Sequence, residues 1–145
     1  MRGESVMSSQ RFARFLLWLN AAVWLGFGLG YTVAPDVFAS LVGAAISRAD
    51  SYRVMTDVGV MMVGISIWYG YCALDDSRTR HGLVSALLIG VGLAVGRVIG
   101  MAVSGSANGV AIGYGVLETL NAALLFFALR AHSAGQLQAR LADDR

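Results

Sequence analysis

Four long apolar stretches dominate this sequence and decide what it can fold into. They cover residues 15–34, 52–74, 82–103 and 109–129. About 20 apolar residues in a helix cross the roughly 30 Å hydrocarbon layer of a bilayer. The chain is 57% hydrophobic and 14% charged, against about 25% charged residues in soluble domains. A chain of 145 residues cannot build a soluble core that hides four such helices. We therefore predict an all-α, four-span transmembrane helical bundle.

The segments between the stretches are short and more polar. We predict a leader over residues 1–14, and a tail over residues 130–145 that forms a frayed or amphipathic helix. Pro35 should end the first span, because proline cannot continue the backbone hydrogen bonds of a helix. Apolar residues at helical spacing then predict a short interfacial helix before the second span. The charged segment 75–81 and the small segment 104–108 should be loops.

The placement of arginine predicts the orientation. All eleven basic residues are arginine, and arginine in short loops marks the cytoplasmic side. The first loop holds only Arg48 outside its helix and the third loop holds none, whereas the leader, second loop and tail hold Arg2, Arg11, Arg14, Arg78, Arg80, Arg130, Arg140 and Arg145. We therefore predict cytoplasmic N- and C-termini and a multi-pass protein of the cell membrane.

Three of the apolar stretches carry ionised residues, and these four charges sum to zero. They are Arg53, Asp57, Arg97 and Glu118. An Arg or Asp at a bilayer centre costs about 2.5 to 3.5 kcal/mol, so four unpaired charges approach about 10 kcal/mol. Arg53 and Asp57 are spaced i, i+4, where an ion pair can form. The guanidinium of Arg97 fits a carboxylate with two hydrogen bonds, so it should meet Glu118, Asp57 or both.

These charges also predict a site, because ionised residues inside spans are functional candidates. With the predicted orientation, all four lie in the outer half of the bilayer or near its midplane. Tyr114 and Asn121 share a helix face with Glu118. The predicted ligand-binding residues are therefore Arg53, Asp57, Arg97, Tyr114, Glu118 and Asn121. The alternative is a purely structural network that fixes helix register and holds no ligand.

Glycines recur every fourth residue in three spans. They are Gly26 and Gly30, then Gly92, Gly96 and Gly100, then Gly109 and Gly113. Small residues at this spacing let membrane helices approach closely. The pattern predicts tight packing inside the bundle, with homodimerisation through one glycine face as the alternative.

Several functions are not expected. The net charge of +2 and the lack of a basic run with aromatics argue against nucleic acid. The single cysteine, Cys72, leaves no disulfide and should pack as an apolar residue near a helix end. No histidine or carboxylate cluster, nucleophile set or phosphate loop is present, so we predict no metal, no cofactor and no catalytic residue. An isomerase with Glu118 as its acid–base group is a remote alternative.

The segment Gly92-Leu93-Ala94-Val95-Gly96-Arg97-Val98-Ile99-Gly100 is followed by a small loop and one glutamate in the last span. Together with Phe27-Gly28-Leu29-Gly30-Tyr31, Ala34-Pro35 and Arg53, it resembles a domain-of-unknown-function family of small bacterial four-helix membrane proteins, distantly similar to DoxX-like proteins. The resemblance covers about residues 15–129 and departs at Asp57. It implies the four-helix architecture and draws attention to Arg53, Arg97 and Glu118, but implies no activity.

Three classes of function remain open. The first is binding of a small amphipathic or anionic molecule, or of a membrane lipid, in an outward-facing pocket. The second is a proton-coupled small transporter that uses Glu118 or Asp57, because low dielectric favours a protonated carboxyl group. The third is an accessory subunit, or a homodimer, that associates in the membrane through its glycine faces.

Overall fold

The structure is a computed structural model that describes residues 2–41, 49–105 and 109–143. Within those ranges the chain is helical and forms no strand. The helices in chain order are α1 (Arg2–Val33), α2 (Pro35–Leu41), α3 (Ala49–Ala73), α4 (Asp76–Ser104) and α5 (Gly109–Asp143). The predicted all-α class is confirmed.

Four of these helices are long and apolar enough to cross a membrane. The candidate spans are Ser9–Val33, Tyr52–Ala73, Asp76–Ser104 and Gly109–Leu137. Their outward faces are also apolar: Val103 is 84% exposed, Leu88 67% and Phe127 65%. Apolar surface of this extent requires a lipid surrounding. The chain is therefore a multi-pass membrane protein.

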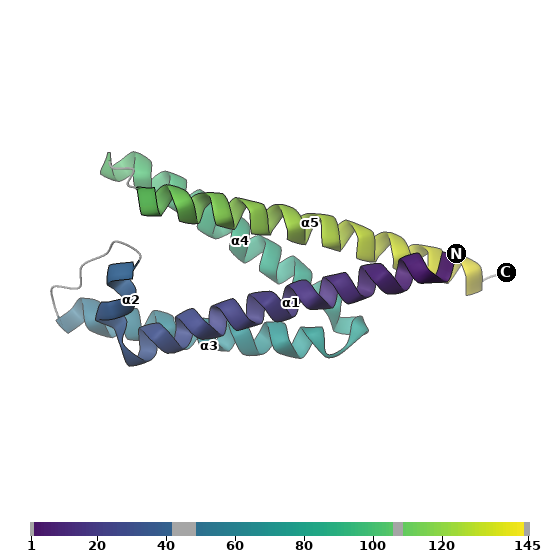
Figure 1. Cartoon of the computed structure of the whole chain (residues 1–145), viewed down its shortest axis with the longest axis horizontal. Coiled ribbons are helices and arrows are strands. Elements are labelled where there is room, and N and C mark those ends of the chain that lie inside the picture. Colours follow the sequence, from purple (N-terminus) through teal and green to yellow (C-terminus); the bar gives the residue numbers. More distant parts are fainter. Residues whose placement is uncertain (1, 42–48, 106–108, 144–145) are drawn as a thin grey trace.

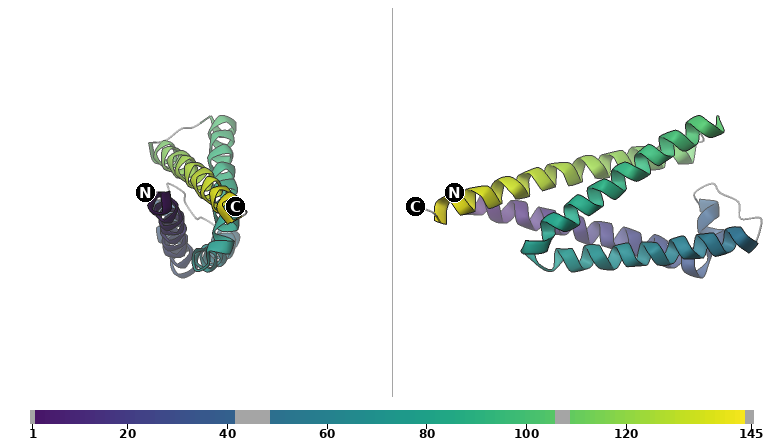
Figure 2. Two further views of the ribbon diagram at one scale, coloured as in Figure 1. Left: turned by 90° about the vertical axis from the view of Figure 1, so that its right-hand side faces the viewer. Right: turned by 180° about the vertical axis from the view of Figure 1, so that it is seen from behind.

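The helices are arranged as two pairs that form a V. α1 lies along α3, and α4 lies along α5 (Figure 1). The pairs meet near the turn between α3 and α4 and splay apart toward the end that carries α2, as both Figure 1 and Figure 2 show. We call these the closed end and the open end. α1 begins and α5 finishes on the same side of the bundle, beyond the closed end (Figure 1).

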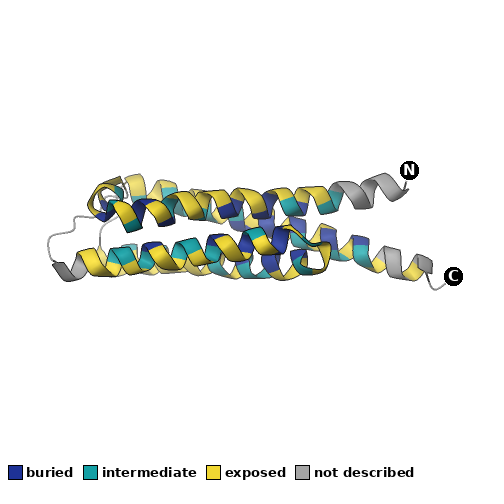
Figure 3. Cartoon of the chain, turned by 90° about the horizontal axis from the view of Figure 1, so that it is seen from below, coloured by how far each residue is buried: buried dark blue, intermediate teal, exposed yellow. Residues whose placement is uncertain are grey.

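The apolar core lies toward the closed end, where all four long helices come together. Figure 3 shows buried residues concentrated there, while the open end is mostly exposed or half-buried. The core consists of Ala13, Leu16, Leu17, Ala21, Tyr69, Cys72, Ala73, Leu83, Ala86, Leu125 and Ala128. Cys72 is a free, fully buried thiol near the end of α3, which confirms its predicted packing role. All four long helices thus pack together at the closed end only.

Glycines bring the backbones of α1 and α3 into direct contact. A Cβ at Gly28 would lie 2.8 Å from the backbone nitrogen of Val63, and one at Gly59 would lie 2.7 Å from that of Thr32. Backbone atoms cannot yield to such a contact, so only glycine fits at both positions. A Cβ at Gly30 would overlap the ring of Phe38, which belongs to α2. Glycine therefore closes the α1–α3 pair and seats α2 against it.

The other predicted glycine contacts do not form. A Cβ would meet no atom within 4 Å at Gly26, Gly92, Gly96, Gly100, Gly109 or Gly113. All six residues are exposed on outward helix faces. The prediction that they pack helices together inside the bundle is wrong, because these faces point away from the neighbouring helices of the same chain.

The start of α4 differs from the sequence prediction. Segment 75–81 was predicted as a loop, but within it only Asp75 lies outside a helix. The Asp75 side chain accepts a 2.9 Å hydrogen bond from the backbone N–H of Ser77. This cap satisfies an unpaired donor and lets α4 begin at once. At the other end, Gly105 terminates α4 in the left-handed conformation, with φ 61°.

The remaining boundaries follow the prediction more closely. α1 ends at Val33, and Pro35 opens α2 at the first helical position, where its missing N–H costs nothing. α2 is the short helix predicted between the first two spans; residues 42–48 of that connection lie outside the described residues. The predicted leader and tail both continue as helix, in α1 and α5.

Candidate functional site

Arg97 of α4 and Glu118 of α5 form a two-point ion pair. The Nε of Arg97 donates to Oε2 of Glu118 at 2.9 Å, and its Nη2 donates to Oε1 at 2.6 Å. The two side chains are only 28% and 16% exposed. Both hydrogen bonds are charge-assisted and fix the relative orientation of the groups. The predicted contact between Arg97 and Glu118 is confirmed.

Glycine makes room for this pair between the two helices. A Cβ at Gly115, one turn before Glu118, would lie 3.5 Å from Cδ of Arg97. The aliphatic stem of Arg97 therefore runs over Gly115, and its guanidinium reaches the carboxylate beyond. A larger residue at 115 would narrow the path that the stem takes from α4 to α5.

Aromatic rings surround the ion pair on the side of the open end. The guanidinium carbon of Arg97 lies 5.4 Å from the ring centroid of Tyr114, within cation–π range. Phe27 of α1 meets Tyr114 edge-on, with centroids 6.4 Å apart. Tyr31 is buried and packs against Phe38 of α2 at 5.9 Å. Aromatic residues of α1 and α5 thus lie beside the charged groups, and α2 packs against these aromatic residues through Phe38.

Asn20 and Asn121 join α1 to α5 on the other side of the pair, toward the closed end. Nδ2 of Asn121 donates to Oδ1 of Asn20 at 3.0 Å, and the reverse bond is 3.3 Å. Asn20 also donates to the carbonyl of Leu16 at 2.9 Å. Asn121 was predicted as a site residue beside Glu118, but Asn20 was missed. The sequence could have indicated Asn20 as a site residue, because it is the one strongly polar residue in the first apolar stretch.

These groups line one cavity between the two helix pairs. Its volume is about 430 Å³, within the roughly 300 to 1,000 Å³ of small-molecule sites. Its lining is apolar apart from the ion pair, two tyrosines and two asparagines: Leu19, Asn20, Val23, Trp24, Phe27, Tyr31, Met62, Ala86, Gly90, Leu93, Arg97, Tyr114, Leu117, Glu118 and Asn121. Several lining residues are also exposed, including Val23 at 50% and Leu117 at 63%. The cavity therefore opens onto the lipid-facing surface.

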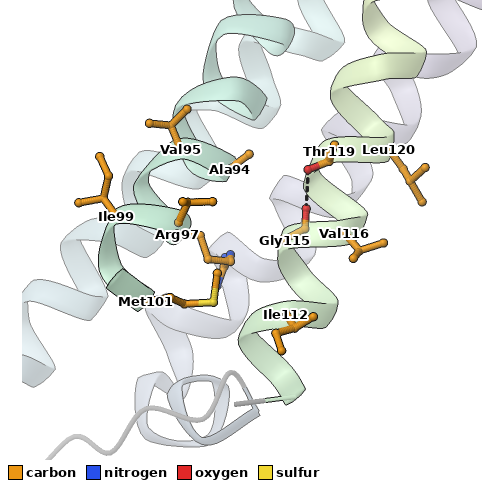
Figure 4. A pocket seen from close by; sticks show the side chains of 11 residues that line it. Ala94, Val95, Arg97, Ile99, Met101, Ile112, Gly115, Val116, Thr119 and Leu120 are labelled. Atoms are coloured by element: carbon orange, nitrogen blue, oxygen red, sulfur yellow. Dashed lines mark hydrogen bonds between the residues drawn. The ribbon is translucent and has the colours of Figure 1, made fainter. Parts of the chain in front are cut away.

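A second hollow lies on the opposite side of Arg97, in the outer seam between α4 and α5. Figure 4 shows it framed by side chains of both helices. Its volume is about 550 Å³, and its lining is Ala94, Val95, Arg97, Val98, Ile99, Met101, Ile112, Gly115, Val116, Thr119 and Leu120. The Thr119 hydroxyl donates to the Gly115 carbonyl at 2.8 Å within its own helix. Apart from the Arg97 stem, this hollow offers little but apolar contact.

Residues 12–129 match the family described as a domain of unknown function, DUF4345. The chain belongs to this family. The matched region contains every residue that lines the cavity. No curated protein and no solved structure matches the chain. The more distant likeness to DoxX proteins stays a prediction.

In this DUF4345 chain, Arg53 and Asp57 do not join the ion pair. Both are exposed on α3, and neither takes part in a salt bridge among the described side chains. The predicted contact between Arg97 and Asp57 is therefore absent, as is the local pair with Arg53. α3 lies in the other arm of the V, which diverges from α4 toward the open end (Figure 1). Of the α3 side chains that the structure describes, only Met62 lines the cavity.

The closed end holds a separate set of polar contacts. Nε of Arg14 donates to the carbonyl of Ala73 at 2.7 Å, and Nη1 lies 3.7 Å from the Asp76 carboxylate. His132 was predicted to lie outside the spans, yet it is 1% exposed, and its Nε2 lies 3.1 Å from Gln136. The described residues bring together no group of three metal-ligating side chains. The contacts of Arg14 tie α1 to the α3–α4 turn. The contact between His132 and Gln136 lies within α5.

Proposed function

We propose that this membrane protein binds a small amphipathic molecule whose polar head lies beside Arg97 and Glu118. The observation that carries the proposal is the position of the ion pair in the wall of a cavity of about 430 Å³ that opens toward lipid. An apolar tail would remain among the acyl chains, and the head would meet polar groups that lipid cannot satisfy.

The cavity supports binding over a purely structural role for the charges. Fixing the register of α4 against α5 requires only the contact between Arg97 and Glu118. Fixing that register requires neither the cavity beside the two side chains nor the hydrogen bonds between Asn121 and Asn20 of α1. Protein interiors are close-packed, and unfilled space costs stability. A cavity whose walls include these polar groups is therefore better explained by a bound molecule.

The proposed site differs from the predicted one by four residues, two of which are added and two removed. It keeps Arg97, Tyr114, Glu118 and Asn121, and it adds Asn20 and Tyr31. Arg53 and Asp57 are left out because neither lines the cavity. With the cytoplasmic termini that the arginine distribution predicts, the open end faces outward, and the ligand would enter from the outer leaflet.

The test is analysis of the small molecules that co-purify with the chain from its host. Wild type is compared with Leu93→Trp, which fills the cavity and leaves the ion pair intact, and with Arg97→Ala. Arg53→Ala serves as the matched control, because Arg53 is exposed on α3 away from the cavity. We expect one compound with wild type and the control, and its loss from both cavity variants. Equal recovery with Leu93→Trp would overturn the proposal.

A second candidate, association with another membrane helix, is favoured by the open glycines. Gly92, Gly96 and Gly100 form a row on α4 at which a Cβ would meet nothing within 4 Å. Such rows admit close approach of a helix from outside the chain. Replacing Gly96 with leucine should then abolish a defined larger species in native electrophoresis. A chain that runs as a monomer with and without the substitution would exclude this function.

The proton-coupled transporter receives no such support. If Glu118 were the proton carrier, its protonation would leave the Arg97 guanidinium without its partner inside the protein. Asp57, the other proposed proton carrier, does not line the cavity.

A further inference from the structure

The ion pair leaves the cavity without net charge. Among the described residues that line it, only Arg97 and Glu118 are charged, and the two hydrogen bonds between them let each neutralise the other. A ligand anion would have to displace Glu118 or remain beside a neutral site. In either case a charge would lose its hydration without a counter-charge, which is strongly unfavourable. A cation meets the same obstacle.

The cavity keeps both hydrogen-bond donors and acceptors free, and its donors are the groups that could recognise a ligand oxygen. Arg97 uses Nε and Nη2 for Glu118, and within the described part of the chain its Nη1 has no hydrogen bond. A guanidinium can only donate. The hydroxyls of Tyr31 and Tyr114 also make no hydrogen bond to described residues and can donate to a ligand. The two asparagine amides, in contrast, are largely occupied with each other. A ligand oxygen that accepts hydrogen bonds would therefore be recognised.

The apolar part of the lining is rich in flat rings. Trp24, Phe27, Tyr31 and Tyr114 all line the cavity. Phe27 and Tyr114 meet edge to face, at an interplanar angle of 74°. Aromatic walls of this kind favour a ring that can make offset-stacked or edge-to-face contacts.

We infer that the ligand of this cavity is an uncharged amphiphile that carries a planar ring and a carbonyl or ether oxygen. The inference rests on the proposed function and narrows it, since the sequence alone suggested an anionic head for Arg97. The oxygen accepts hydrogen bonds from Arg97 Nη1 and the tyrosine hydroxyls, and the ring lies against Trp24 and Phe27.

Three matched probes test this assignment. They are 2-acetylnaphthalene, which is a neutral ketone, 2-naphthoate, which is the corresponding anion, and 2-naphthylmethylammonium, which is a cation. Binding to the full chain in phosphatidylcholine nanodiscs is measured by equilibrium dialysis, with protein-free nanodiscs subtracted. We expect the ketone to bind wild type at least about tenfold more tightly than either ion. Preference for 2-naphthoate or the ammonium probe would overturn the inference while leaving the proposed function standing.

Variants of the ion pair provide a second test of the same inference. Glu118→Gln leaves the Arg97 charge uncompensated, so 2-naphthoate should bind this variant at least about tenfold more tightly than it binds wild type. The double variant Arg97→Gln with Glu118→Gln should bind the ketone more weakly than wild type, because the Arg97 donor is gone, and should show no gain for the anion. Arg53→Gln is the control and should match wild type. Ketone binding to Glu118→Gln without any gain for 2-naphthoate would contradict the charge argument. If no probe binds wild type or any variant, the proposed function itself fails.

Discussion

Asn20 on α1 and Asn121 on α5 exchange side-chain hydrogen bonds at 3.0 and 3.3 Å, and they form a polar bridge between the two arms of the V. The bridge lies between the close-packed core of the closed end and the cavity. Replacing one asparagine by leucine leaves the other amide without its partner. Replacing both removes the polar groups altogether. The two cases should differ in stability.

We expect Asn20→Leu or Asn121→Leu alone to lower the free energy of unfolding by about 1 kcal/mol. The double variant should lose less than the sum of the two single losses, because no orphaned amide remains. Denaturant unfolding of the four proteins in detergent gives the coupling energy. Additive single and double losses would show that the amides do not interact in the folded state.

The ion pair should behave in the same way with larger effects. Arg97→Gln or Glu118→Gln leaves one partly buried charge without its partner, and we expect a loss of about 2 to 3 kcal/mol for either change. The double glutamine variant should recover much of that loss, since both charges are gone. The same unfolding measurement applies. A double variant less stable than both single variants would mean that the pair itself, and not the orphaned charge, sets the cost.

The sequence predicted the four spans and the Arg97–Glu118 contact for definite physical reasons. Long apolar stretches have few alternatives to crossing a bilayer. Arg97 and Glu118 lie on consecutive spans joined by a short connection, so their depths nearly coincide. Opposite charges at one depth in an apolar medium are driven together. Local pattern and chain connectivity were sufficient for this part of the site.

The V shape and its cavity could not be predicted from the same pattern. Asp57 seemed to share the depth of the ion pair, but depth along a span does not say in which arm a helix lies. Asn20 was visible as an isolated polar residue, yet its partner on α5 is 101 positions away in sequence. Glycine spacing likewise did not show whether a glycine faces a neighbouring helix or the outside. Gly28 and Gly59 face a neighbouring helix, while Gly96 faces outward.

The contact between α1 and α3 yields a prediction with a control on the same helix. Gly59→Ala places a Cβ 2.7 Å from the backbone nitrogen of Thr32, so the helices must separate, at a cost of about 1 to 3 kcal/mol. Gly64→Ala meets nothing within 4 Å and should be neutral or stabilising by up to about 1 kcal/mol, through alanine's higher helix propensity. Thermal unfolding in detergent compares the two. Equal effects would show that α1 and α3 are not in close backbone contact.

The cap at Asp75 yields a prediction about acid. Hydrogen bonds from Ser77, above all from its backbone N–H, lower the pKa of the Asp75 carboxyl, with a smaller contribution from the nearby Arg78 guanidinium. A lowered pKa in the folded state means that the carboxylate stabilises the fold above its unfolded-state pKa of about 3.9. That contribution is lost as pH falls through the lower, folded-state value.

Asp75→Asn keeps an oxygen that can cap α4 but removes the titrating group. We expect wild type to be the more stable protein at neutral pH. The difference in melting temperature between the two proteins should shrink as pH drops from about 5 toward 3. Asp36→Asn provides the control, because Asp36 is exposed on α2, away from the α3–α4 turn. A difference between wild type and Asp75→Asn that stays constant over this range would show that the carboxylate charge does not stabilise the start of α4.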